Sequence, residues 1–294
     1  MQCDWIPKAQ ERLLSLRSGG PGWSYRPGCA PSIEPTALAS LGLLSAGSRS
    51  SGAHAGAAWL ARLQQPDGAL GVSTELTHPC WPTSHGLLLW SALGGFESNR
   101  QRAAAWLLGQ RGKTVTRPAD RAIGHDPTLT GWSWVPDTHS WLEPTALAVL
   151  ALRRHGLANH PRILEGLRLI RDRAVPSGGW NYGNRAVFGR ALRPQPAPTG
   201  LALLSLSGEA LDAETRAVAA RACRYLLTTL PTIRAASSLG WGLLGLSAWN
   251  LFPADASDWM AESAAQNLSR PDAAPRLAIL LLAAGDQSYR VLSS

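Results

Sequence analysis

Two kinds of helical segment alternate along the chain. Segments of the first kind are apolar on every side and span residues 31–44, 78–93, 140–152, 195–206, 237–249 and 274–285. A helix without a polar face must be covered by neighbours all round, so these six segments are predicted to be inner helices. Four of them contain Pro-Thr before a run of aliphatic residues, with the threonines at Thr36, Thr83, Thr145 and Thr199. Because proline suits a helix start, each of the four is predicted to begin at its proline.

Segments of the second kind place charged and apolar residues at helical spacing, as expected for a helix with one wet face. They span residues 6–18, 52–65, 100–112, 161–174, 213–230 and 257–269, and each precedes an inner segment. The pattern predicts an all-α fold of six outer-inner helix pairs. Because repeated pairs must close on themselves or be capped, we predict an (α/α)6 toroid, formed by a single domain over residues 1–294.

Loops rich in glycine and aromatic residues lead from outer to inner helices at residues 19–32, 64–81, 131–141 and 178–197. They all precede inner-helix N-termini, so they are predicted to gather at one end of the ring, here called the mouth, where the helix dipoles are positive. Aromatic faces there could stabilise a carbocation. The predicted substrate-binding residues are Trp23, Tyr25, Arg26, Trp81, Trp132, Trp134, Trp141, Trp180, Tyr182 and Arg185. The alternative is that the tryptophans stiffen the loops between repeats.

The charge and composition of the chain indicate which kinds of partner molecule it can bind. The formal net charge of +8 favours an anionic partner. Only Lys8 and Lys113 are lysines and no basic run occurs, so nucleic acid is not a predicted partner. Without a Cys-x-x-Cys pair, the four cysteines are expected to be free thiols: Cys3, Cys29, Cys80 and Cys223.

The hydropathy pattern bears on location. No apolar segment reaches the roughly 20 residues of a membrane-spanning helix, and the first residues lack the apolar block of a signal peptide. A cytoplasmic location is expected, with peripheral contact to a membrane as a further option.

The repeats resemble those of the terpenoid cyclase and protein prenyltransferase superfamily. The resemblance rests on QxxDG at residues 64–68, GGW at 178–180, the sequences GWSY and GWNY, and the Pro-Thr-aliphatic helices, and it extends from about Glu11 to Ala284. It implies an α/α toroid whose apolar, aromatic-lined cavity holds an isoprenoid chain.

The resemblance also implies candidate catalytic residues. Squalene-hopene-type cyclases carry Asp-x-Asp-Asp-Thr before an inner helix, and the middle aspartate is the acid. Aligned on Thr145, Glu143 takes the acid position and the flanking acids are absent; the equivalent positions of other repeats hold Glu34, Trp81 and Ala197. The alternative is that Glu143 only stabilises its helix N-terminus. Asp137 and His139, in the preceding loop, form a second candidate acid-base pair.

Protein prenyltransferases bind zinc through Asp, Cys and His. The mouth loops contain Cys29, His78, Cys80 and His139, but not at the spacing of that family. No metal or other cofactor is predicted, with magnesium and zinc left open.

Three functions are compatible with these residues. The favoured one is an isoprenoid-processing enzyme of the terpene cyclase or prenyltransferase type, which binds a prenyl chain and starts its cyclisation with a proton. The second is a non-catalytic toroid that binds a prenyl lipid or a protein. The third is a carbohydrate-processing enzyme, which needs two carboxylates about 5 to 9.5 Å apart, and Glu34 with Glu143 is the obvious pair. The oligomeric state is not predicted.

Overall fold

The computed structural model describes residues 4–17, 20–47, 51–116, 124–208, 211–285 and 288–292. Within these residues the chain forms twelve α-helices in outer-inner pairs. The outer helices are α1 (Trp5–Ser15), α3 (Ser51–Leu63), α5 (Glu97–Gly109), α7 (Pro161–Asp172), α9 (Ala213–Thr229) and α11 (Ala256–Leu268). The inner helices are α2 (Ile33–Ser45), α4 (Pro82–Leu93), α6 (Leu142–Arg154), α8 (Pro196–Leu206), α10 (Ala236–Ser247) and α12 (Ala274–Leu282).

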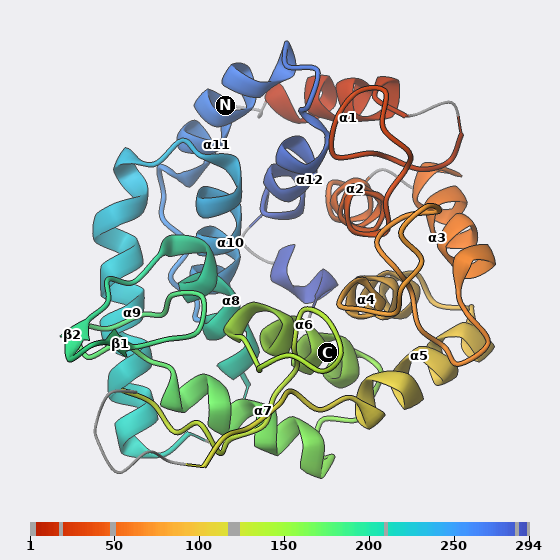
Figure 1. Ribbon diagram of the computed structural model, residues 1–294. Helices are drawn as coiled ribbons and strands as arrows, with labels where there is room; N and C mark the ends of the chain where they lie inside the picture. Colours follow the sequence, from red (N-terminus) through yellow and green to blue (C-terminus); the bar gives the residue numbers. More distant parts are fainter. Residues whose placement is uncertain are drawn as a thin grey trace.

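The six inner helices form a closed ring, and the outer helices surround it (Figure 1). Each inner helix packs on the next one along the chain, and α12 packs on α2. At this closing contact a Cβ on Gly42 would lie 2.5 Å from the backbone carbonyl oxygen of Ala278. The backbones of α2 and α12 can approach this closely because Gly42 has no side chain. The predicted (α/α)6 toroid is confirmed.

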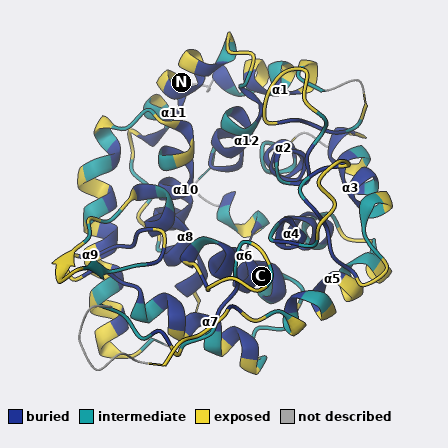
Figure 2. Ribbon diagram, in the orientation of Figure 1, coloured by how far each residue is buried: buried dark blue, intermediate teal, exposed yellow. Residues whose placement is uncertain are grey.

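The inner helices are almost entirely buried, whereas the outer helices are buried on one side only (Figure 2). In α2 every residue from Ile33 to Leu43 is buried except Glu34, and in α6 every residue from Leu142 to Leu152 is buried except Glu143. The outer helices keep an exposed face. Glu34 and Glu143, which hold the same place in α2 and α6, are therefore the residues of these two stretches that are not buried.

The helix starts differ from the prediction in one respect. Only α4 begins at its Pro-Thr proline, whereas α2, α6 and α8 begin two residues earlier. The proline is then the third helical residue, whose N–H would still have no acceptor within the helix. A proline therefore loses no hydrogen bond at either position.

The Pro-Thr threonines tie each inner helix to the loop before it. Their buried Oγ1 atoms accept hydrogen bonds of 2.9 to 3.0 Å from the backbone N–H groups of Trp23, Leu70, Trp132 and Trp180. Each hydroxyl also donates to the carbonyl oxygen of the same loop residue. The repeated threonine is thus explained by a repeated structural bond.

Hydrogen bonds also join neighbouring loops to each other. The N–H of Ile33 donates to the carbonyl of Val72 at 2.9 Å, and the N–H of Leu142 donates to the carbonyl of Tyr182 at 3.1 Å. Between these, the N–H of Trp81 donates to the carbonyl of Trp134 at 3.2 Å. The loops before α2, α4, α6 and α8 consequently form one continuous belt, and the predicted gathering of these loops at the mouth is confirmed.

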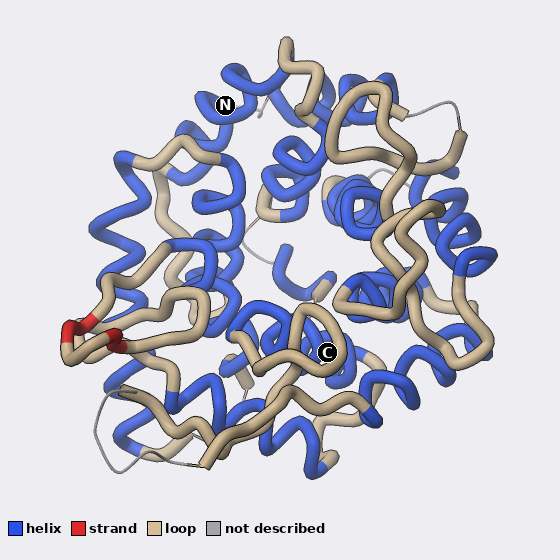
Figure 3. The backbone as a smooth tube through the Cα atoms, in the orientation of Figure 1, coloured by secondary structure: helices blue, strands red, loops and turns tan. Residues whose placement is uncertain are grey.

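Short elements complete the ring. A hairpin of β1 (Ala186–Val187) and β2 (Arg190–Ala191) lies in the loop before α8 (Figure 3), and the 3-10 turn η1 (Leu230–Thr232) follows α9. A second 3-10 turn, η2 (Ser288–Val291), packs on α2 and α10 at the centre of the ring. Its Arg290 carbonyl accepts a 3.0 Å bond from Arg154, the last residue of α6, so η2 lies at the end opposite the mouth.

No helix in the described part of the chain has both the length and the hydropathy that a membrane span needs.

Candidate functional site

Three side chains come together at the mouth, and a fourth, Glu143, lies within range of the charge of Glu34. We call the four the glutamate cluster: Tyr25, Glu34, His85 and Glu143. Glu34 and Glu143 are the second residues of α2 and α6, and His85 lies in the first turn of α4. The Tyr25 hydroxyl donates a hydrogen bond to the Glu34 carboxylate. His85 Nε2 lies 3.8 Å from Glu34 Oε1, which is too long for a hydrogen bond. The negative charge of Glu34 also reaches Glu143.

Glu143 has the chemistry of a proton donor at neutral pH. Burial raises its pKa to about 7, and the charge of Glu34 acts in the same direction. The positive N-terminus of α6 opposes both effects because it favours the ionised carboxylate. Burial and the second carboxylate outweigh it, so a large fraction of Glu143 carries a proton near pH 7.

Two members of the cluster, Tyr25 and His85, stay uncharged. Burial, followed by the charge of Glu34, raises the pKa of Tyr25, so the phenol remains a hydrogen-bond donor. Burial lowers the pKa of His85, and Glu34 only partly offsets this. His85 is therefore a neutral imidazole, and within the described residues its buried Nδ1 has no hydrogen-bond partner. Glu34 is held by a neutral phenol rather than neutralised by a cation.

Sequence reasoning missed His85, although a signal was present. Two residues after the Pro-Thr threonine, the other repeats have Leu38, Leu147 and Leu201, all buried in the ring. A buried histidine in place of a leucine is the exception that a comparison of the repeats would have found.

The structure corrects one alignment between repeats. The N–H of Trp81 bonds to the next loop, as the N–H groups of Ile33 and Leu142 do. Trp81 therefore corresponds to these residues and not to Glu143. The second repeat is shorter by one residue at this point and has no counterpart of the glutamate.

Three predicted substrate-binding tryptophans belong to the wall of the ring. Trp23, Trp132 and Trp180 are buried, and their indole N–H groups donate to carbonyl oxygens of the preceding outer helix at 2.7, 2.8 and 2.7 Å. The acceptors are Leu13, Leu107 and Ile170. These rings present no open face to a ligand, which favours the alternative that they stiffen the repeats.

The other predicted binding residues are distributed over the mouth. Trp81 and Trp134 are half-buried and pack edge to face with ring centroids 5.3 Å apart. Trp141 and Tyr182 are exposed and line a hollow of about 290 Å³. The remaining two are arginines in different places: Arg26 lines a separate hollow beside α1, and Arg185 donates to the carbonyl of Asp172 at 3.3 Å.

Asp137 and His139 do not form the predicted pair. Asp137 is exposed in a turn with φ of 63°, a left-handed conformation that aspartate tolerates. His139 Nδ1 lies 3.1 Å from the carbonyl oxygen of Lys113. In the described ranges no hydrogen bond or ion pair joins the two side chains, so the loop supplies no ready acid-base couple.

A metal site would need several His, Cys, Asp or Glu side chains in one place. No three His, Cys, Asp or Glu side chains come together as a metal site in the part of the chain that the structure describes. Cys29, Cys80 and Cys223 are free thiols, and Cys3 lies outside the described residues. Burial raises the pKa of Cys80 to about 11, so this mouth cysteine stays a thiol and not the thiolate that zinc prefers.

Neither a scan against family models nor a search of curated proteins finds a match for this chain. Solved structures do match. A variant of the type II terpene cyclase MstE from Scytonema, in complex with its substrate geranylgeranyl dihydroxybenzoate, aligns with a TM-score of 0.59 and 17% identity over 92% of this chain and 79% of that one. A protein from Actinoplanes aligns with a TM-score of 0.59 and 16% identity over 99% of both chains.

The ent-copalyl diphosphate synthase from Streptomyces platensis aligns with a TM-score of 0.54 and 16% identity, over 86% of this chain and 50% of that one. The chain has the α/α toroid fold of the type II terpene cyclases. The resemblance drawn from the Pro-Thr repeats is thereby confirmed for the fold. Because one fold hosts many activities, the chemistry must be argued from the site.

Proposed function

We propose that this protein binds an isoprenoid chain in its ring and starts cyclisation by proton transfer from Glu143. The observation that carries the proposal is a carboxyl group with a pKa of about 7 at the start of an otherwise apolar inner helix. A general acid works best when its pKa lies near the working pH, because it is then both protonated and able to give up the proton. A carboxyl group with its ordinary pKa would be ionised at neutral pH.

The proton transfer can be written with the residues present. The Glu143 carboxyl gives its proton to one carbon of a terminal alkene, the π electrons form the new C–H bond, and the neighbouring carbon becomes a carbocation. A second alkene of the same chain attacks this carbon and closes a ring. Loss of a proton from the final cation returns an alkene, so the net reaction is an isomerisation.

The glutamate cluster fits a cationic intermediate. After proton transfer, the carboxylate of Glu143 and that of Glu34 both lie at the mouth. Because Tyr25 and His85 are neutral, no cation within the cluster offsets this negative charge. A carbocation formed nearby is stabilised by the two carboxylates. The half-buried indoles of Trp81 and Trp134 are available for cation–π contact.

The same pair of glutamates supports glycoside hydrolysis as a second candidate. That reaction also uses two carboxyl groups, one of which keeps its proton because its pKa is raised. Glu143 and Glu34 meet this condition, because the charge of Glu34 reaches Glu143 and helps to raise its pKa. The substrate-bound relative of the same fold, which holds a prenylated compound, makes the isoprenoid the first choice.

The test is a direct assay of the purified full chain. Farnesyl diphosphate, geranylgeranyl diphosphate, squalene and geranylgeranyl dihydroxybenzoate are incubated separately at pH 7 and analysed by mass spectrometry. We expect one of them to give a product of unchanged mass and altered retention. If all four remain unchanged while an organic extract of the protein contains a prenyl lipid, the protein is a binder and the proposal fails. Cleavage of nitrophenyl glycosides would instead support the second candidate.

A further inference from the structure

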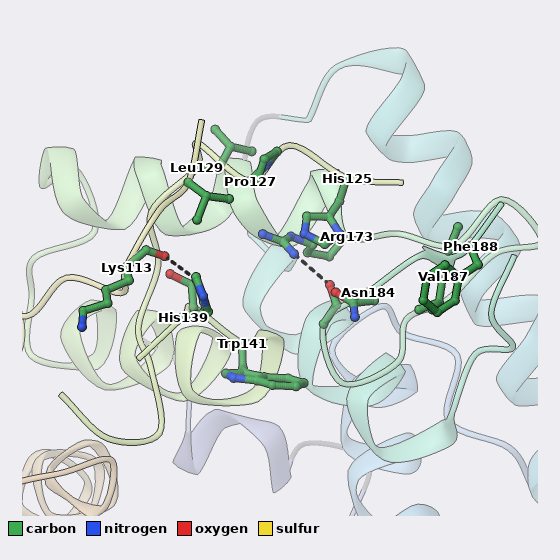
Figure 4. A pocket seen from close by; sticks show the side chains of 14 residues that line it. Lys113, His125, Pro127, Leu129, His139, Trp141, Arg173, Asn184, Val187 and Phe188 are labelled. Carbon is green, nitrogen blue, oxygen red and sulfur yellow. Dashed lines mark hydrogen bonds between the residues drawn. The ribbon is translucent and has the colours of Figure 1, made fainter. Parts of the chain in front are cut away.

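A second cavity lies outside the glutamate cluster, and we call it the loop cleft. It has a volume of about 560 Å³, within the range of small-molecule sites, and lies between the loop that contains Lys113 and His139, the end of α7 and the β1–β2 hairpin (Figure 4). None of the four residues of the cluster lines it. The proposed cyclisation therefore leaves this cavity without a role.

Basic side chains form part of the loop cleft. Among the residues that the structure describes, its lining includes Lys113, His125, His139 and Arg173 but no Asp or Glu. Arg173 is buried at 6% exposure, and its Nη1 donates to the carbonyl of Gly183 at 3.1 Å. Its Nε has no hydrogen bond within the described residues.

Nearby carboxylates offset this charge only in part. Asp172 lies 3.5 Å from Arg173 Nε, and Asp126 also acts on Arg173. Even so, the pKa of His125 is lowered to about 4, first by burial and then by Arg173 and Arg185, while Asp126 opposes them. The Nδ1 atom of His125 is buried and unpartnered among the described residues, so a bound anion could receive a hydrogen bond there.

Apolar side chains form the rest of the lining of the loop cleft. Trp141 is 38% exposed and Phe188 is 90% exposed, the highest exposure of the large hydrophobic residues in the described part of the chain. Phe188 has φ of 48° at the tip of the hairpin, so a strained backbone holds an aromatic ring at the edge of the cleft. Figure 4 shows Phe188 and Val187 on one side of Arg173, with Leu129 and Pro127 on the other.

We propose that the loop cleft binds an organic anion, whose acidic group meets His125 and Arg173 and whose apolar part lies against Trp141 and Phe188 (Figure 4). The charged groups recognise a phosphate or carboxylate, and the aromatic walls require an attached apolar group. This site does not depend on Glu143 and goes beyond the proposed cyclisation.

The test compares three probes on the full chain by calorimetry at pH 7: octyl phosphate, octanol and inorganic phosphate. We expect octyl phosphate to bind at least about tenfold more tightly than either of the others. It alone has both an acidic group for the basic residues and an apolar chain for the aromatic residues. In NMR titrations the pKa of the His125 imidazole should rise when octyl phosphate is bound, since an anion stabilises the charged ring.

Variants distinguish this site from others. His125→Leu and Phe188→Ser should each weaken octyl phosphate binding by about fivefold or more, whereas Arg216→Gln, which removes one charge from the exposed face of α9, should not. His125 is half-buried and Phe188 is exposed, so neither substitution removes a core side chain and the fold should be retained. Equal binding of octanol, equal binding of inorganic phosphate, or unchanged affinity in both variants would each overturn the proposal. Glu143→Gln should bind octyl phosphate normally, so failure of the cyclisation is recognised separately.

Discussion

Replacing Glu143 with glutamine should lower the rate of cyclisation by at least about a hundredfold, because general acids contribute factors of that size. The same substitution should stabilise the protein above pH 7. Glutamine keeps the shape of the carboxyl group but never ionises. The half-buried position that raises the pKa of Glu143 therefore also lowers the stability of the fold at high pH.

The direction of this pH effect follows from linkage. The folded pKa of Glu143 is about 7 and the ordinary value is 4.5, so between these values the folded chain holds a proton that the unfolded chain has lost. The stabilisation is present below pH 4.5 and disappears as the pH rises through 7. Between pH 5 and pH 8 the wild type should lose on the order of 2 kcal/mol relative to Glu143→Gln.

Product assays and urea unfolding at the two pH values check both effects. Glu75→Gln is the matched control, because Glu75 is an exposed glutamate of a mouth loop. It should follow the wild type in rate and in stability. Equal turnover by Glu143→Gln removes this residue from the acid role, and an unchanged pH dependence of stability contradicts the raised pKa.

Trp180→Ala should destabilise the fold by about 3 to 5 kcal/mol, as expected for a fully buried aromatic side chain. Trp180 has 0% exposure, its indole N–H donates to Ile170 in α7 at 2.7 Å, and its backbone N–H donates to Thr199 in α8 at 2.9 Å. The substitution leaves a cavity between an outer and an inner helix and removes the indole bond that fixes their spacing.

Trp141→Ala is the control for this prediction, because Trp141 is exposed and has no such bond through its indole in the described structure. It should change the free energy of unfolding by less than about 1 kcal/mol. Both values come from urea unfolding at pH 7. Equal losses in the two variants would contradict the division of the tryptophans into wall and mouth residues.

The parts of the fold that the sequence predicted are those with a local pattern. All-round apolarity marked the inner helices, one-sided polarity marked the outer helices, and Pro-Thr fixed four of the helix starts to within two residues. The gathering of the loops at the mouth followed from their order along the chain. Glu143 was found because alignment on Thr145 placed it, two residues earlier, at the position of the middle aspartate of the cyclase motif.

The rest depended on contacts between residues distant in sequence. That Glu34 acts on Glu143 follows only from closure of the ring, and the pKa of Glu143 follows from its burial. The wall role of Trp132 depends on the Leu107 carbonyl, which no local pattern shows. The loop cleft forms where the β1–β2 hairpin meets the end of α7, and the hairpin has no periodic signal in the sequence.

The most direct test of the account is the pKa of the Glu143 side chain itself. It can be measured by ¹³C NMR of labelled glutamate carboxyl groups between pH 3 and pH 9, with the resonance assigned by its absence in Glu143→Gln. We predict a value of about 7 in the wild type and a lower value in Glu34→Gln, because removal of the neighbouring charge makes ionisation easier. A wild-type value at or below the ordinary 4.5 would contradict the proposal that Glu143 is the proton donor.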